Sequence, residues 1–292
     1  MNPIPRDELR PLVRGIYDLQ KMRIQAGNRL VANFKKKLGI DITKKEDLAD
    51  SKAKEIMKQM RAAYNRIADA IGDNPTIRQF TGNEAGIIDR YTDFILSAQY
   101  MRLLDAEERQ FKMLAHVVEQ FPVWSEYLKD VKGCGPAMAA VLLSEIDIKK
   151  AHYPAYIWAY AGLDVAPDGR GRGKHPEHLV KRKYIAKDGT EKERDSITFN
   201  PFLKTKLVGV LAGSFLRAKD NPYATIYYDY KHRLENHPKH KEKTPGHRHN
   251  MAKRYMIKRF LADLYVAWRS IEGLSVAPEY TESKLDMHHH GK

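Results

Sequence analysis

The chain has 292 residues, of which 42% are hydrophobic, enough to bury at least one core and to form about two domains. Lys and Arg outnumber Asp and Glu by 51 to 37, and the resulting net charge of +14 predicts a polyanionic partner or an acidic membrane surface. A single cysteine excludes an intrachain disulfide framework, and no apolar run approaches the roughly 18 residues of a membrane span. Because the N-terminus is polar and lacks a signal-peptide core, we expect a cytoplasmic protein with no membrane partner.

Amphipathic helices are predicted through most of the first 120 residues. Apolar residues recur every three or four positions over 7–37, 46–71 and 84–119. We expect residues 1–100 to form an N-terminal helical region, as a bundle or coiled coil, and residues 101–130 to form a helical connector. As an alternative to simple packing, the long helix 84–119 pairs with a second copy of the chain in a homo-oligomer.

A glycine-rich turn follows the connector at Gly133-Cys134-Gly135-Pro136, and an apolar helix follows the turn. This pattern is typical of a helix-hairpin-helix, because closely spaced glycines permit a turn at φ > 0 and let a phosphate approach the backbone. Pro136 suits the first helical position, and the free N–H groups at a helix start favour an anion. Gly133, Gly135 and Pro136 are therefore candidate phosphate contacts; the alternative is a helix–turn–helix that only packs.

The remaining elements combine short helices with one exposed hairpin. A short helix is expected over residues 155–163, ending at a glycine, and a loop over 164–178. Charge-rich extended runs at 179–186 and 190–199 flank Asp188-Gly189, which is a two-residue hairpin signal. Further helices are predicted over 201–219, 222–236 and 250–271, and the tail 273–292 is expected to be disordered.

Two basic segments carry the rest of the candidate binding residues. Residues 168–194 hold nine basic and five acidic residues, and residues 231–259 hold ten basic residues against two glutamates. Arginine offers bidentate contacts to phosphate and to guanine edges, and tyrosines beside basic residues suit contacts with single strands or RNA. The alternatives are a solvated loop and tyrosines that only pack helices. The candidate contacts are Arg170, Arg172, Lys174, Lys181, Arg182 and Lys183 in the first segment, and Lys253, Arg254, Lys258 and Arg259 in the second.

No metal site is expected in the histidine-containing second segment. His232, His237, His240, His247 and His249 have no cysteine nearby, and their spacings match no common zinc motif.

Several short stretches resemble one family in consistent order over about residues 100–272. The stretches are Gly133-Cys134-Gly135-Pro136 with Ala139 and Ala140, Tyr160-Ala161-Gly162-Leu163, Phe199-Asn200-Pro201, Asn221-Pro222 with Tyr227 and Tyr228, and the basic helix from Ala252 to Trp268. They resemble the C-terminal domain of the insertion-sequence 110/116/902 family of transposases, which are RNA-guided recombinases. The resemblance implies a mainly α-helical fold in which residues 131–272 form a helix-hairpin-helix-containing transposase-like domain with a small β-hairpin. It also implies DNA, and a guide-like RNA, as partners.

Two departures from the family concern catalysis. The family carries an N-terminal RuvC-like domain whose acidic residues hold magnesium, whereas residues 1–100 here look helical throughout. The family also places a nucleophilic serine in the loop after the Tyr-Ala-Gly-Leu stretch, and the loop from Asp164 to Gly173 contains no serine. The catalytic residues are therefore unknown and the enzyme class stays open. No cofactor is expected, and Mg²⁺ only if the chain is catalytically active.

The sequence as a whole predicts a nucleic-acid-binding protein, with DNA as its ligand, linked to transposition or recombination and associated with the nucleoid. The first alternative is an active transposase whose catalytic centre is divergent or supplied by a partner chain. The second alternative is a helical module that binds an acidic protein.

Overall fold

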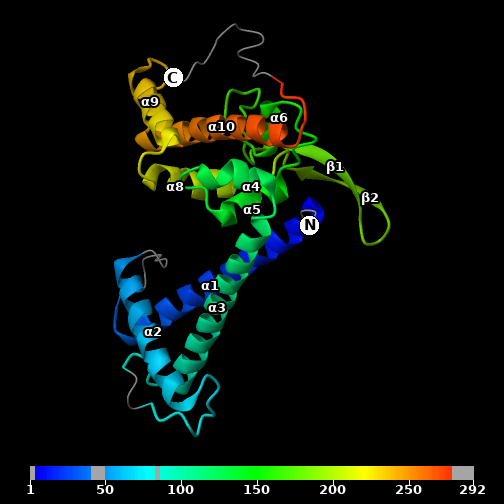
Figure 1. The fold of residues 1–292 in the computed structure, drawn as a ribbon. Coiled ribbons are helices and arrows are strands. Elements are labelled where there is room, and N and C mark those ends of the chain that lie inside the picture. Colours follow the sequence, from blue (N-terminus) through cyan, green and yellow to red (C-terminus); the bar gives the residue numbers. More distant parts are fainter. Residues whose placement is uncertain (1–3, 41–49, 83–85, 278–292) are drawn as a thin grey trace. The chain divides into compact units, whose positions relative to one another are not determined.

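The computed structural model describes residues 4–40, 50–82 and 86–277. The described chain is mainly α-helical with a small two-stranded antiparallel sheet, which confirms the predicted fold class (Figure 1). It divides into two compact units, Pro11–Met113 and a second unit made of Met1–Arg10 with Leu114–Lys292. None of the described helices is long and apolar enough to cross a membrane. Most of the tail predicted at 273–292 lies outside the described residues.

The unit Pro11–Met113 is built from three helices around one apolar core. They are α1 (Arg6–Lys37), α2 (Ser51–Ile71) and α3 (Tyr91–Val118), and the unit boundary falls within α1 and α3. Phe34, Met60 and Tyr100 are fully or almost fully buried in this core. No strand occurs in the described part of this unit, so its helical content agrees with the amphipathic periodicity of the sequence.

The long third helix is shorter than predicted at its start. It begins at Tyr91 rather than residue 84, and residues 86–90 form a turn in which Gly86 has φ +63°. Ile88 is fully buried although it lies outside the helix, so its apolar character fitted the helical period without requiring a helix. The predicted starts at residues 46 and 84 fall in segments outside the described residues.

The helical connector is also interrupted. α3 ends at Val118, and Phe121 is extended with φ −95° and ψ 120°. Pro122 then begins the short helix α4 (Pro122–Glu126), because proline disfavours the α conformation at the preceding residue and lacks an N–H for a continuing helix. A single helical turn, η1 (Leu128–Asp130), leads into the glycine-rich turn.

The second unit packs its helices around α10 (Pro245–Ile271). Phe260 of α10 is fully buried, and its ring lies 5.2 Å from that of Phe215 and 5.4 Å from that of Tyr223. Helices α5 (Pro136–Glu145) and α6 (Pro154–Tyr160) complete the same core, with Val141, Leu142 and Ile157 at most 2% exposed. The other elements are η2 (Pro176–His178), α7 (Pro201–Lys204), the π-helical η3 (Thr205–Leu211), α8 (Ala212–Arg217) and α9 (Pro222–Asn236).

Helix α10 begins five residues earlier than the predicted residue 250. The hydroxyl of Thr244 accepts a hydrogen bond from the N–H of His247, and Pro245 occupies the first helical position. A threonine cap followed by proline is a regular helix start, which the basic composition of this stretch concealed.

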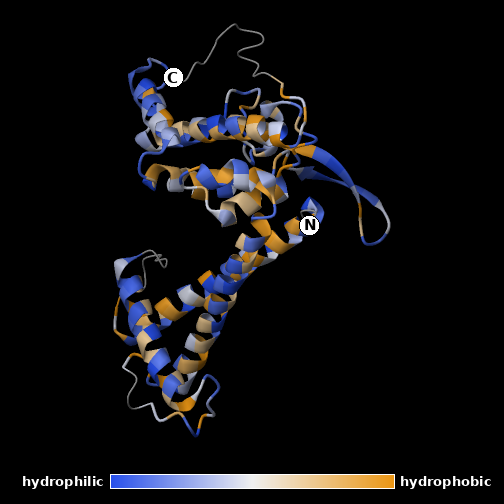
Figure 2. Ribbon diagram, in the orientation of Figure 1, coloured by the Kyte–Doolittle hydropathy of each residue, from blue (hydrophilic) through white to orange (hydrophobic). Residues whose placement is uncertain are grey.

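The predicted hairpin is present, with a different turn. β1 (Val180–Ile185) pairs with β2 (Glu191–Ser196) from Val180↔Ser196 to Ile185↔Glu191. The N–H of Gly189 donates to the carbonyl of Ala186, and Gly189 has φ +78°. The connection is therefore longer than two residues, with glycine in its left-handed position. Both strands are exposed and mostly hydrophilic (Figure 2).

Candidate nucleic-acid interface

The glycine-rich turn uses its two glycines differently. Gly133 has φ +89°, and a Cβ added there would lie 3.1 Å from the carbonyl oxygen of Ser214 and from the ring of Phe215. The space that Gly133 keeps free of a side chain is therefore taken up by α8, and its contact with a phosphate stays a prediction. Gly135 has φ −80°, so it does not need the left-handed region; a Cβ there would meet nothing within 4 Å.

The start of α5 remains open at Gly135 and Pro136. The preceding helical elements are very short, so the helix-hairpin-helix stays a prediction. Between the two glycines, Cys134 is 3% exposed, and burial raises the pKa of its thiol to about 12, so this cysteine is a packing residue.

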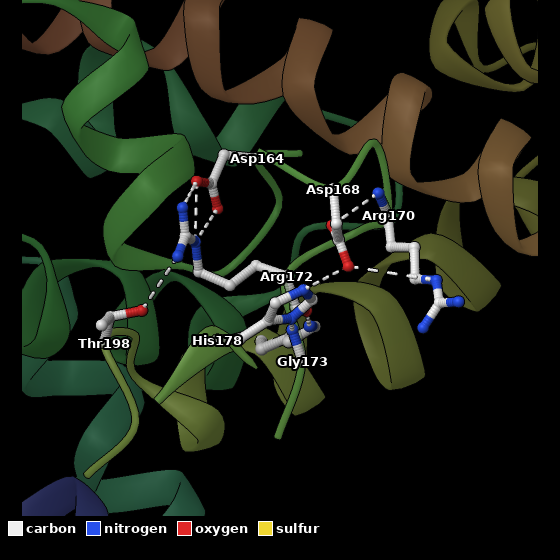
Figure 3. A network of polar contacts seen from close by, with 8 residues as sticks. Asp164, Asp168, Arg170, Arg172, Gly173, His178 and Thr198 are labelled. Atoms are coloured by element: carbon white, nitrogen blue, oxygen red, sulfur yellow. Dashed lines mark hydrogen bonds and ion pairs between the residues drawn. The ribbon is translucent and has the colours of Figure 1, made fainter. Parts of the chain in front are cut away.

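An ion pair between Arg172 and Asp164 helps to hold the loop after α6 in shape. The guanidinium of Arg172 contacts the carboxylate of Asp164 through Nε at 2.8 and 2.9 Å and through a terminal nitrogen at 2.7 Å (Figure 3). In the same loop, Val165 and Gly171 form an isolated antiparallel backbone bridge. The bidentate geometry fixes Arg172 at the protein surface rather than leaving it free in solution.

A second polar contact in the loop joins a histidine to a carboxylate. His178 is almost fully buried, its Nε2 lies 3.0 Å from Asp168, and its Nδ1 accepts the N–H of Gly173 at 3.0 Å (Figure 3). Since Nδ1 is an acceptor, Nε2 carries the hydrogen and donates a hydrogen bond to the carboxylate of Asp168. Both ring nitrogens are engaged in hydrogen bonds, so this pair helps to hold the shape of the loop. Arg170 lies outside the pair, exposed, 3.9 Å from Asp168.

Four cations meet around Asp164, and we call them the cation cluster: Arg172, Lys204, Arg254 and Lys258. Lys204 of α7 donates a hydrogen bond to the carbonyl of Arg172. Arg254 of α10 packs so closely on Gly171 that a Cβ there would clash with its guanidinium. Lys258, one turn further along α10, lies 5.0 Å from the centre of the Trp158 ring. The cluster thus joins two segments that are far apart in the sequence.

The positive charge of the cluster exceeds the negative charge of the carboxylates around it. Burial and the neighbouring Arg254 lower the pKa of Lys204 to about 8, and burial also lowers the pKa values of Arg254 and Lys258. Asp164 acts on Lys204 and Lys258 and is already bound to Arg172, and Asp168, which also acts on Arg172, is bound to His178. Among the described residues, none accepts a hydrogen bond from the Arg254 or Lys258 side chain. An anion at this point would relieve the excess charge.

The hairpin presents two faces of different charge, because side chains alternate along a strand. On one face Lys181 and Lys183 stand opposite Asp195 and Glu193, and Glu191 lies opposite Ile185, so this face has no excess positive charge. On the other face Arg182 stands directly opposite Arg194. Like charges in this position repel, which a polyanion would offset.

The basic face of the hairpin continues into the loop. Arg182, Arg194 and Lys174 line one shallow groove, and the guanidinium of Arg194 lies over the ring of Tyr184 at 5.2 Å. Of the hairpin residues singled out from sequence, the geometry therefore favours Arg182 over Lys181 and Lys183.

Two residues predicted as contacts lie near the cation cluster on α10, and three residues of the interface were not predicted from sequence. Lys253 and Arg259 lie on α10 beside the cluster residues and are partly exposed. Lys204, Asp164 and Arg194 were not singled out from sequence. The one sequence signal for Lys204 is that it and Lys206 are the basic residues of the mostly apolar run from Pro201 to Leu211.

Several predicted aromatic contacts are packing contacts. Tyr223 and Tyr227 are buried, and Tyr230 stacks on Tyr255 at 4.1 Å. Within residues 4–40, 50–82 and 86–277, no group of three or more His, Cys, Asp and Glu side chains is placed to hold a metal ion.

Comparison with known proteins identifies the central part of this unit. Residues 125–185 match the family described as Transposase IS116/IS110/IS902 family. The match runs from α4 through the turn, α5, α6 and the loop to the end of β1, and confirms the resemblance to a C-terminal transposase domain over these residues. No curated protein and no solved structure matches the chain.

Proposed function

We propose that this chain is a DNA-binding protein that acts in transposition or recombination, with DNA and a guide-like RNA as its partners. The observation that carries the proposal is the cation cluster, in which Arg254 and Lys258 are half-buried and have no acceptor among the described residues. Burying a cation is costly unless an anion is paired with it, and the family match makes a nucleic-acid phosphate the natural anion.

The remaining contacts extend this interface. We assign phosphate contacts to Gly135, Pro136 and the adjoining Gly133 at the start of α5, and to Arg170, Lys174 and Arg182 in the loop and hairpin. The positive electrostatic potential around these contacts comes in part from Lys181, Lys183, Lys253 and Arg259. On this proposal residues 131–272 are the nucleic-acid-binding domain, and the protein acts at the nucleoid.

Charge neutralisation within the cluster tests the proposal. The double variant Arg254→Gln/Lys258→Gln should bind a DNA duplex more weakly, by about tenfold or more for each lost contact. The slope of log K against log salt should also become shallower by about 1.8, since each phosphate contact contributes about 0.9.

The matched control is Lys52→Gln/Lys58→Gln, which removes the same charge from exposed positions on α2. If both double variants lose affinity equally, only net charge matters, and the cluster is not the binding site.

The family match favours a second candidate, an active recombinase whose catalytic groups come from a divergent site or a partner chain. Purified protein would then cut a DNA that carries the ends of its own mobile element, in the presence of Mg²⁺. Absence of any cleaved or joined product with that matched DNA would overturn this candidate.

A further inference from the structure

One face of the short helix α6 and the residue before it expose three tyrosines. Tyr153, Tyr156 and Tyr160 are 53%, 56% and 38% exposed, and steps of three and four residues place them on the same side. The rings of Tyr153 and Tyr156 are nearly parallel, 16° apart in plane, with centres separated by 6.1 Å. Grouped exposed aromatics mark interaction sites more often than single ones do.

Hydrogen bonds anchor Tyr160 and the backbone that leads into α6. The hydroxyl of Tyr160 accepts a hydrogen bond from the Asn200 side chain at 3.0 Å, and the Tyr160 carbonyl accepts the N–H of Asn200 at 2.7 Å. Before the helix, the buried guanidinium of Arg269 donates to the carbonyls of Ile148 and Ala151, both at 2.9 Å. A fixed aromatic surface loses little conformational freedom on binding.

A pocket of about 320 Å³ opens beside these rings. Tyr156 and Tyr160 line it together with the apolar side chains of Ile146 and Ile157. It combines an apolar interior with aromatic walls, which suits a flat ring system.

Basic residues surround this pocket. Arg6 lies 3.5 Å from Asp147, Arg10 lies 3.2 Å from the buried Glu145, and Lys150 lies 3.8 Å from Asp147. Three cations against two carboxylates leave the rim with excess positive charge, and both arginines remain about two-fifths exposed. A ligand with a flat aromatic group joined to an anion complements this arrangement.

We infer that the tyrosine face and its pocket bind an unpaired nucleobase of single-stranded nucleic acid. A base stacks on Tyr156 and Tyr153, and the adjoining phosphates contact Arg6 and Arg10. A base paired inside a duplex has no free face to offer, so the site selects single-stranded segments. The inference rests on the proposed nucleic-acid function and adds a separate site for unpaired strands.

The test compares binding of the full chain to a labelled single-stranded oligothymidylate and to a duplex. Tyr156→Ala should weaken single-strand binding by about 5- to 150-fold and leave duplex binding unchanged. Tyr156→Phe keeps the ring and should bind like the wild type, whereas Tyr156→Leu, which keeps only apolar contact, should resemble the alanine variant. Met113→Ala, at another exposed apolar residue, is the matched control and should bind like the wild type.

A second measurement does not depend on any variant. A single strand containing 2-aminopurine should lose fluorescence on binding to the wild-type protein, because stacking quenches the base. Wild-type-like single-strand binding by Tyr156→Ala or by Tyr156→Leu, or unquenched 2-aminopurine in the bound complex, would overturn the inference while duplex binding still supports the proposed function. Failure of the wild type to bind either nucleic acid would overturn both.

Discussion

Lys204 is the cluster residue whose removal gives the most specific result. Its ammonium is half-buried, lies 4.5 Å from the centre of the Phe199 ring, and is next to Arg172 and Arg254 with Asp164 as the nearby carboxylate. Lys204→Met keeps the length of the side chain and removes the charge. We expect this variant to bind DNA more weakly and to be at least as stable as the wild type.

The size and the pH dependence of the binding effect follow from the environment of Lys204. A charge-assisted hydrogen bond to a phosphate contributes about 1.5–3 kcal/mol, so the variant should lose about 10- to 150-fold in affinity at pH 7. With a pKa of about 8, Lys204 is mostly charged at pH 7 and mostly neutral at pH 9. Affinity of the wild type should therefore fall over this range toward that of the variant. A bound phosphate, which raises the pKa, makes the fall gradual.

Lys204→Met should weaken DNA binding, but it should not destabilise the folded chain. The pKa of Lys204 is lower in the folded chain than the ordinary value of 10.5, so the unfolded chain binds more protons between about pH 8 and 10.5. The free energy of unfolding of the wild type therefore rises with pH through this window, relative to that of Lys204→Met. Below pH 8 the charged lysine carries its full burial penalty, which the variant lacks.

Binding titrations and urea unfolding at pH 7 and pH 9 measure both effects. Lys206→Met is the matched control, because burial lowers the pKa of Lys206 to about 8 as well, with no contribution from the cluster residues. It should change the pH dependence of stability without weakening DNA binding. If Lys204→Met binds DNA like the wild type at pH 7, or if both variants lose affinity equally, the reasoning is wrong.

Two further predictions concern the fold and the hairpin. Gly162→Ala should lower the free energy of unfolding by about 2–5 kcal/mol in urea, because φ is +65° and the new Cβ would lie 2.7 Å from the Phe199 ring. Gly169→Ala, with φ +77° and open space, should lose only about 1–2 kcal/mol, and equal losses would contradict this explanation. On the hairpin, Arg194→Gln should weaken DNA binding more than Lys181→Gln in the same titration; the reverse order would refute the assignment of the basic face.

Local signals in the sequence located most of the elements. The helix predicted over 222–236 starts at the observed residue of α9, where the Asn221 side chain caps it by accepting the N–H of Tyr223 at 2.8 Å. Thr244 and Pro245 begin α10 with the same chemistry, although the predicted helix begins only at residue 250. Ile88 shows the opposite case, because an apolar residue buries equally well from a turn and from a helix.

The sequence does not predict which segments far apart in the chain come into contact in the fold. Arg172 and Arg254 were each predicted as contacts, but no periodicity relates a loop to a helix so far along the chain. Their meeting depends on how Gly171 packs against α10, and the participation of Lys204 depends on the same packing. The two faces of the hairpin likewise required the pairing register, since composition alone made Lys181 and Arg182 equivalent.

The salt dependence of DNA binding by the full chain tests the central claim most directly. If half-buried and surface cations contact phosphates, log K for a duplex should fall linearly with log salt, with a slope of about −0.9 for each phosphate contacted. Contacts from the cluster, the loop and the basic face of the hairpin predict a slope steeper than about −3. A slope near zero, or no binding to DNA or RNA at low salt, would contradict the account.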